Sequence, residues 1–167
     1  RDSQTNKLLF EPFRIIEKGS LKIGIVGVTD KLPDSTKSMI ADNYVEAGNH
    51  YIDEASKQAD IIVIMVNSDR KTYSELPTLF ANADFIVTSG STNMTRENTA
   101  QKDGGPFLYS CGKQGKYMSV LSVQMKNKKD PIVDISSHEK NISSIQKRFE
   151  RLQNKDPNKS LDELYAG

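Results

Sequence analysis

The stretch that decides the fold is Asp60–Val66, DIIVIMV, in which an unbroken apolar run follows one aspartate. A run of Ile and Val without polar alternation is typical of a strand covered on both faces, as strands of parallel sheets are. Two similar runs lie on either side of it in the sequence, Leu21–Val28 (LKIGIVGV) and Asp84–Val87 (DFIV). The three runs together predict a parallel sheet.

Helices are predicted between these strands. In Asp42–Ala59 apolar residues recur at spacings near 3.6 residues, and Gly48 is expected to delay the start of that helix. A shorter helix is predicted over Tyr73–Ala81, with Pro77 limiting its start. The alternation of strands and helices predicts an α/β fold with right-handed crossovers.

The chain changes character after the third apolar run. Phe107–Ser110 and Tyr117–Met125 are predicted as shorter strands, and the second alternates as a half-exposed antiparallel strand does. Gly112 and Gly115 would supply the turn between them, and Pro131–Ile135 is a candidate edge strand. The sheet is therefore expected to be mixed, with parallel units followed by an antiparallel hairpin.

A helical extension over residues 136–167 is predicted to follow an α/β domain over residues 1–135. Ser136–Glu139 (SSHE) and Ser160–Glu163 (SLDE) both have the capping-box pattern that opens a helix. Asp156-Pro157 is expected to end the first of these helices.

The first of these two helices carries a narrow apolar seam. Its members recur at spacings of 3, 4 and 3 residues: Ile142, Ile145, Phe149 and Leu152. The seam would pack either on the chain's own sheet or on a partner, and a narrow seam suits contact with another helix. We expect a partner, which would be the remainder of the same protein, a second copy or a different chain.

Composition excludes several classes of protein. The 167 residues include 23 basic and 22 acidic ones, so the formal net charge of +1 lacks the basic surplus of nucleic-acid-binding proteins. One cysteine cannot form an intramolecular disulfide, and two histidines cannot build a His-rich metal site. The apolar runs are too short for a transmembrane helix.

Polar loops follow the three predicted parallel strands. Ligands of open α/β sheets bind beyond the carboxyl ends of the strands, and a turn rich in Ser, Thr and Gly can present N–H groups to a phosphate. An ordinary hydrogen-bonded loop is the alternative interpretation. Asp69 would pair with Arg70, face Asp30, or simply be an exposed charge. The candidate ligand-binding residues are Asn67, Ser68, Asp69, Thr88, Ser89, Gly90, Ser91, Thr92 and Asn93.

Four segments resemble the second half of the calcineurin-like metallophosphatase domain of the 5′-nucleotidase family. They are Lys18–Thr29 (KGSLKIGIVGVT), Ala59–Asp69 (ADIIVIMVNSD), Asp84–Thr92 (DFIVTSGST) and Gly112–Ser119 (GKQGKYMS). The resemblance runs from about Glu11 to Met125. It implies half of a metallophosphatase-like αββα sandwich.

The resemblance also shows where this chain departs from the family. A metal-binding histidine of the family falls on Asn67, and two more fall on Gly90 and Thr92. Glycine has no side chain and threonine is a poor ligand for a transition metal, so a two-metal hydrolytic centre is not expected. The ligand motifs of the family's first half do not occur in this sequence. We therefore expect no catalytic residue, metal ligand or cofactor here.

These expectations lead to a functional hypothesis, a non-catalytic metallophosphatase-like module with a structural or recognition role in a larger protein. The first alternative is part of a metal-dependent phosphoesterase whose other half lies elsewhere. The second is a nucleotide- or phosphate-binding domain without turnover. The resemblance implies an extracytoplasmic, periplasmic or exported, setting and suggests a redox module as one partner, although the sequence contains no haem-attaching Cys-x-x-Cys-His.

Overall fold

The computed structural model describes residues 1–89, 93–97, 99, 101–102, 104–125, 127, 130–155, 159–160 and 162–163. Its contacts divide the chain into two units. The first unit comprises Arg1–Thr95 and Gln101–Val133, and the second comprises Arg96–Ala100 and Asp134–Gly167. No helix among the residues described is both long and apolar enough to cross a membrane.

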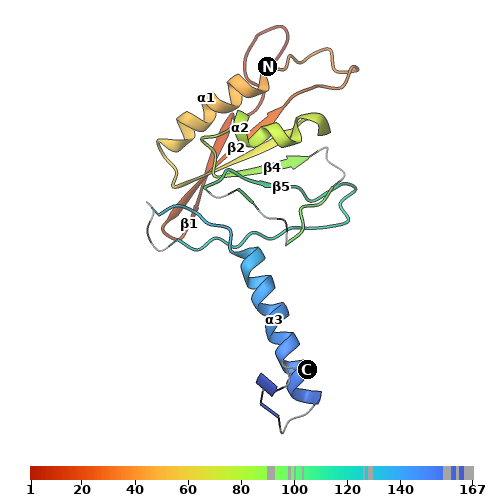
Figure 1. Ribbon diagram of the computed structural model, residues 1–167. Coiled ribbons are helices and arrows are strands. Elements are labelled where there is room, and N and C mark those ends of the chain that lie inside the picture. Colours follow the sequence, from red (N-terminus) through yellow and green to blue (C-terminus); the bar gives the residue numbers. More distant parts are fainter. Residues whose placement is uncertain are drawn as a thin grey trace. The chain divides into compact units, whose positions relative to one another are not determined.

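The first unit is built on one five-stranded sheet with the spatial order β1-β2-β3-β4-β5 (Figure 1). β1 is antiparallel to β2, and β2 to β5 run parallel to one another. The predicted α/β class with a mixed sheet is therefore confirmed. The strands are β1 (Phe13–Lys18), β2 (Leu21–Thr29), β3 (Ile61–Asn67), β4 (Phe85–Ser89) and β5 (Phe107–Tyr109).

Two helices cover one face of this sheet (Figure 1). They are α1 (Tyr44–Ser56) and the short α2 (Leu76–Leu79), which follows a 3-10 turn, η1 (Arg70–Glu75). Pro77 lies in the first turn of α2, as predicted. The main core fills the space between these helices and the sheet, and its buried residues are Val26, Ile52, Ala55, Ile62, Ile64, Val66, Leu76, Phe80, Ala83 and Ile86.

Gly48 does not delay the start of α1, contrary to the sequence-based expectation. The side chain of Asn43 accepts the N–H groups of Val45 and Glu46, so the helix begins ahead of the glycine. Gly48 is buried in the middle of α1, and a Cβ atom there would lie 2.6 Å from Cε1 of Phe80. The glycine therefore makes room for the fully buried ring of Phe80.

We expect Gly48→Ala to destabilise the chain. Overpacking of a well-packed core costs typically about 1–3 kcal/mol, and alanine recovers only about 1 kcal/mol of helix propensity. The net loss should reach up to about 2 kcal/mol in urea unfolding. Gly27→Ala is the matched control, because a Cβ there would meet nothing within 4 Å. Equal stability of the two variants would contradict this account of Gly48.

Two aspartates align the parallel strands. Asp60 donates its N–H to the carbonyl of Lys22, and its Oδ2 accepts the N–H of Lys22 at 2.9 Å. Asp84 makes the same pair of bonds with Ile62: its N–H donates to the Ile62 carbonyl, and its Oδ2 accepts the Ile62 N–H at 2.7 Å. Each aspartate stands directly before a strand and holds the preceding strand of the sheet. We call this pair of reciprocal bonds the aspartate clasp.

The clasp of Asp84 predicts a pH dependence of stability. Burial raises the pKa of Asp84, against the opposing effect of the Ile62 N–H. A carboxyl group with a raised pKa therefore adds its full contribution to the free energy of unfolding at a pH below its ordinary pKa. This contribution is lost as the pH rises through the pKa of the folded state. We expect the free energy of unfolding of the wild type, relative to Asp84→Asn, to fall from acid to neutral pH. Urea unfolding at a series of pH values measures this difference.

The asparagine variant keeps an oxygen that can accept the Ile62 N–H without carrying charge. Asp34→Asn, at an exposed position, is the control for losing one carboxylate. If the free energy of unfolding of the wild type instead rises relative to that of Asp84→Asn as the pH rises, the prediction is wrong. In that case the hydrogen bond from Ile62 to the ionised carboxylate outweighs the cost of burying its charge.

The second face of the sheet carries a smaller core. Ile61, Phe85 and Phe107 are buried there. Half-buried apolar residues of the sheet and of the later chain pack against them, namely Leu21, Ile23, Val63, Tyr109, Val123, Met125 and Ile132. This cover is incomplete, because Met65, which alternation places on the same face of β3, is 52% exposed.

The prediction of an antiparallel hairpin after the third parallel strand is wrong. Phe107–Tyr109 forms β5 as predicted, but it pairs in parallel with β4. Neither Tyr117–Met125 nor Pro131–Ile135 forms a ladder in the part of the chain that the structure describes. The antiparallel hairpin is β1–β2 instead, and its turn contains Gly19 at a φ of 61°.

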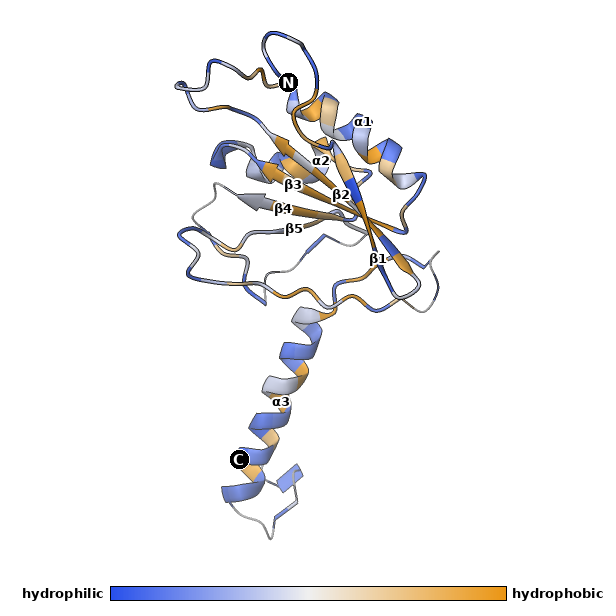
Figure 2. Ribbon diagram, turned by 180° about the vertical axis from the view of Figure 1, so that it is seen from behind, coloured by the Kyte–Doolittle hydropathy of each residue, from blue (hydrophilic) through white to orange (hydrophobic). Residues whose placement is uncertain are grey.

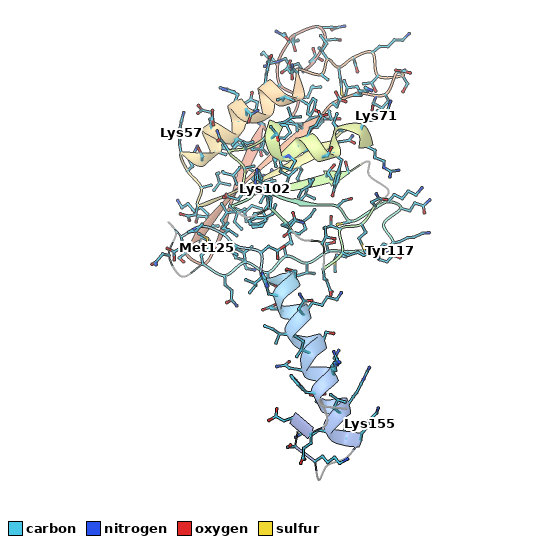
Figure 3. The ribbon with its side chains drawn as sticks, viewed as in Figure 1. Lys57, Lys71, Lys102, Tyr117, Met125 and Lys155 are labelled. Carbon is cyan, nitrogen blue, oxygen red and sulfur yellow. The ribbon has the colours of Figure 1, made fainter. Side chains whose placement is uncertain are left out.

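The alternation in Tyr117–Met125 does not mark a strand. Figure 3 labels the two ends of this segment, and its last residues reach the second face of the sheet without pairing. Val123 and Met125 pack on that face, whereas Met118 and Val120 are 87% and 77% exposed. Tyr117 and Leu121, which share a side of the alternation with Val123, are 59% and 43% exposed, so only the last part of this unpaired segment is half-buried.

The second unit contains α3 (Ser136–Lys155), which confirms the predicted helix. Ser136 is its first residue and not its cap, because Oδ1 of Asp134 accepts the Ser136 N–H at 2.9 Å. The capping box of Ser160 and Glu163 is confirmed by bonds of 3.0 and 3.3 Å between each backbone N–H and the other side chain. The predicted break at Asp156-Pro157 lies outside the described residues.

Candidate functional site

The carboxyl ends of three parallel strands meet at one edge of the sheet. Thr29 at the end of β2 is in register with Asn67 of β3, and Asn67 is in register with Ser89 of β4. Partners in a parallel ladder share a face of the sheet, so these side chains lie on its second face. The three predicted loops therefore start side by side, as expected of a parallel sheet.

Hydrogen bonds tie the first two strand ends together. Nδ2 of Asn67 lies 3.3 Å from Oγ1 of Thr29, and the N–H of Asp30 donates to the carbonyl of Asn67 at 2.8 Å. Oγ1 of Thr29 in turn donates to the carbonyl of Lys31 at 3.1 Å. The Asn67 amide is thus part of a loop-to-loop network within the chain.

Asp69 pairs with Lys31, at 2.8 Å between Oδ2 and Nζ, and not with Arg70. The hydrogen bond and charge of Lys31 lower the pKa of Asp69, and the same bond raises the pKa of Lys31. Both side chains are exposed, so solvent screens their attraction. The carboxylate at this edge therefore has a cationic neighbour, which disfavours a second cation.

Not all predicted ligand-binding residues are accessible. Ser68 and Thr88 are buried, at 9% and 5% exposure, and bond within the chain: Thr72 Oγ1 donates to Ser68 Oγ, and Thr88 Oγ1 donates to the carbonyl of Ser89. The exposed candidates are Asn67, Asp69, Ser89 and Asn93. Gly90, Ser91 and Thr92 lie outside the described residues.

A second hydroxyl network, which the sequence analysis missed, anchors the chain after β4. Oγ1 of Thr95 accepts the N–H of Ser110 at 3.0 Å and lies 3.4 Å from the hydroxyl of Tyr73. Oγ of the fully buried Ser110 accepts the N–H of Gly112. These bonds hold the chain near Met94 against Cys111, with which it forms an isolated β-bridge. The network is satisfied internally and serves the fold.

An apolar cavity of about 190 Å³ lies at the end of β2, beside Thr29. The sequence analysis missed it; the only local signal was the apolar residues at 8–10 and 39–40, which lie outside the predicted strands and helices. Its apolar lining would suit an apolar group rather than a phosphate. The apolar side chains on its walls include Leu8, Leu9, Phe10, Met39, Ile40 and Tyr44.

The metal-binding donors at this edge are few. Within the described ranges, no three His, Cys, Asp or Glu residues gather where they could hold a metal ion. His50 lies on α1 with its ring centroid 4.9 Å from that of Tyr51, and His138 lies on α3. The strand ends themselves offer amide and hydroxyl oxygens and two carboxylates, Asp30 directly after β2 and Asp69, which is paired with Lys31.

No protein-family model and no curated protein matches the chain. Solved structures do match part of it. A hypothetical protein from Thermus thermophilus gives a TM-score of 0.47 at 18% identity, over 66% of this chain and 42% of that one. A "Putative 5'-Nucleotidase from Staphylococcus aureus", in complex with alpha-ketoglutarate, gives 0.47 at 17% identity, over 60% and 24%. This chain spans less than half of each protein, and scores at this level carry no argument about function.

We expect Lys31→Gln to raise the pKa of Asp69 toward its ordinary value, because the substitution removes the cation that stabilises the carboxylate. A pH titration of the Asp69 carboxyl carbon by NMR measures this shift. Lys37→Gln, at another lysine of the first unit, is the control for the loss of one positive charge. An equal change in both variants would show that Lys31 acts only through net charge.

Proposed function

We propose that this chain is a non-catalytic, metallophosphatase-like α/β module with a structural or recognition role in a larger protein. The observation that carries the proposal is the state of Asn67 at the end of β3. The family resemblance places a metal-binding imidazole at this position, and here an amide lies within hydrogen-bond distance of Thr29. An amide oxygen is a weak ligand for the transition metals that imidazole binds.

The neighbouring carboxylate supports the same conclusion. A two-metal hydrolytic centre needs several anionic or imidazole ligands aimed at one point. Asp69 is the described carboxylate nearest to Asn67 in sequence after β3, and Lys31 already neutralises it at 2.8 Å. Binding a divalent ion there would require breaking this pair and bringing Lys31 close to a second cation.

The exposed apolar surface of the first unit supports a role in a larger assembly. Met118 and Val120, on the segment whose last residues reach the second face of the sheet, are 87% and 77% exposed, and Met65 on β3 is 52% exposed. Large apolar residues left exposed in this way are available for contact with further protein. On the family resemblance alone, we place this assembly in an extracytoplasmic setting.

Metal content and turnover test the proposal together. We expect the purified chain to hold no stoichiometric Zn, Mn or Fe and to hydrolyse neither bis-p-nitrophenyl phosphate nor AMP with added Mn²⁺, Zn²⁺ or Co²⁺. Elemental analysis measures the metal content. The absorbance of released p-nitrophenolate follows hydrolysis of the diester, and a colorimetric phosphate assay follows hydrolysis of AMP. Metal or turnover that Asn67→Ala abolishes would overturn the proposal, because it would make the end of β3 a working site.

The melting temperature with and without AMP tests the alternative, a domain that binds phosphate without turnover. AMP that raises the melting temperature of the wild type, but not of Lys31→Gln, would favour a nucleotide-binding domain and contradict a purely structural role for this edge. We expect AMP to have no effect on either protein.

A further inference from the structure

The cavity beside Thr29, which we call the β2 cavity, has an aromatic and aliphatic lining. Figure 2 shows apolar stretches of chain, in orange, near the N-terminus and along α1. The cavity walls include three aromatic side chains, those of Phe10, Tyr44 and Tyr51. Phe10 is 77% exposed, so its ring is left largely uncovered by the chain itself.

The fold holds the walls of the β2 cavity in place. Residues 1–3 pair with residues 38–40 through an isolated β-bridge and two backbone hydrogen bonds of 2.9 Å. On the α1 side, the ring of Tyr44 meets the edge of the buried Phe80 ring, with 6.0 Å between the centroids. A cavity whose walls are fixed in this way is preformed, which lowers the cost of binding a ligand.

The polar groups beside this lining belong to the main chain of β2. The N–H and C=O groups of successive strand residues point to opposite sides of the strand. Lys22 and Asp30 use theirs on the β3 side, so Gly27 and Thr29 direct theirs to the β1 side. The register of β1 would place Pro12 opposite Gly27, and proline has no N–H to donate.

Main-chain groups of β2 therefore remain available at the cavity. Within the described residues, no hydrogen bond uses the N–H or the C=O of Thr29, or the C=O of Gly27. Both residues line the cavity. One donor and two acceptors thus lie along one strand edge, next to an apolar space. An apolar pocket with a few polar groups is the usual form of a small-molecule site.

The charged side chains on the cavity wall are already paired. Arg1 donates from Nε to both carboxylate oxygens of Asp42, at 3.1 and 2.8 Å. Glu11 accepts a bond from Arg14 at 2.9 Å. A charged ligand would have to break one of these pairs or enter the apolar space without a partner, which is costly. The cavity therefore favours a neutral ligand.

From these observations we infer that the β2 cavity binds a neutral aromatic molecule with one ring and one hydroxyl group. Its ring would lie among the aromatic side chains of the wall, and its hydroxyl would accept the Thr29 N–H and donate to the Gly27 carbonyl. The size agrees, because an apolar cavity of about 150 Å³ can hold a benzene ring. The β2 cavity, at about 190 Å³, leaves room for one substituent.

The inference goes beyond the proposed function, because it gives the module a ligand away from the degenerate metal site. It does not use the side chains of Asn67 or Asp69, which carry the argument against a metal centre. A chain that binds metal could still bind the phenol, and a chain that binds neither would overturn this inference alone.

A fluorine NMR titration of the full chain with 4-fluorophenol tests the inference. We expect saturable binding with a dissociation constant of about 1 mM or tighter. Ala47→Leu should weaken it at least about tenfold, because the larger side chain fills the cavity. Ala81→Leu is the matched control, since Ala81 is exposed and does not line the cavity. Non-saturable binding by the wild type, or equal affinity of the two variants, would overturn the inference.

The backbone amide of Thr29 gives a second measurement that needs no variant. We expect its proton resonance to move with saturation by 4-fluorophenol, because the ligand oxygen would accept this N–H. The amide of Thr72, which already donates to the carbonyl of Asp69, is the control and should not move. A Thr29 resonance that stays in place while the ligand binds would contradict the proposed site.

Two further probes test the chemical class of the ligand. Fluorobenzene lacks the hydroxyl and should bind severalfold more weakly than 4-fluorophenol, because the main-chain groups would lose their partner. The anion 4-fluorobenzoate should bind at least about tenfold more weakly, because no free cation faces it. Equal affinity of fluorobenzene would contradict the role of the β2 edge. Equal or tighter binding of the benzoate would contradict the neutral class.

Asp42→Asn tests the pairing argument. The substitution removes the charge that neutralises Arg1, so the affinity for 4-fluorobenzoate should rise and approach that for 4-fluorophenol. Asp34→Asn, at an exposed position outside the cavity wall, is the control for the loss of one negative charge. An equal gain in both variants would show that net charge, and not Arg1, excludes anions from the cavity.

Discussion

The rest of the structure depends on the aspartate clasp, in which Asp60 and Asp84 each exchange two hydrogen bonds with the neighbouring strand. The N–H of the buried Ile62 would otherwise lack this partner, and leaving a buried backbone group unpaired is costly. A slip of one residue would also move every side chain of the strand to the opposite face. The clasp therefore sets both the division between the two cores and the alignment of Thr29, Asn67 and Ser89.

Local patterns predicted most of the fold. The parallel strands are long apolar runs, and the helices follow from periodicity, from Pro77 and from the Ser160–Glu163 capping box. What failed was the pairing of the remaining strands, which depends on residues far apart in sequence. β1 is short and mixes apolar with charged residues, so nothing local marks Phe13–Lys18 as the antiparallel partner of β2. The alternation in Tyr117–Met125 predicted a half-exposed strand, but only Val123 and Met125 are half-buried, and alternation does not reveal whether a ladder partner exists.

In the candidate site, too, the features with a local sequence pattern could be predicted, and the contacts between residues far apart in sequence could not. That the loops would meet followed from the parallel order of the strands. The burial of Thr88 also had a local signal, because alternation places it on the same face as Ile86, which packs under the helices. The Lys31–Asp69 pair had none, since the two residues are 38 positions apart and meet only because β2 and β3 run side by side. The cavity beside Thr29 likewise depends on segments that only the fold brings together.

The two edges of the sheet limit how the chain can assemble. β1 presents Arg14, Glu17 and Lys18 along one edge, and β5 is only three residues long at the other. Charged and short edge strands are poor templates for a strand of another molecule. Runaway polymerisation by edge-to-edge pairing, the route toward fibrils, is therefore disfavoured despite the Ile- and Val-rich strands inside.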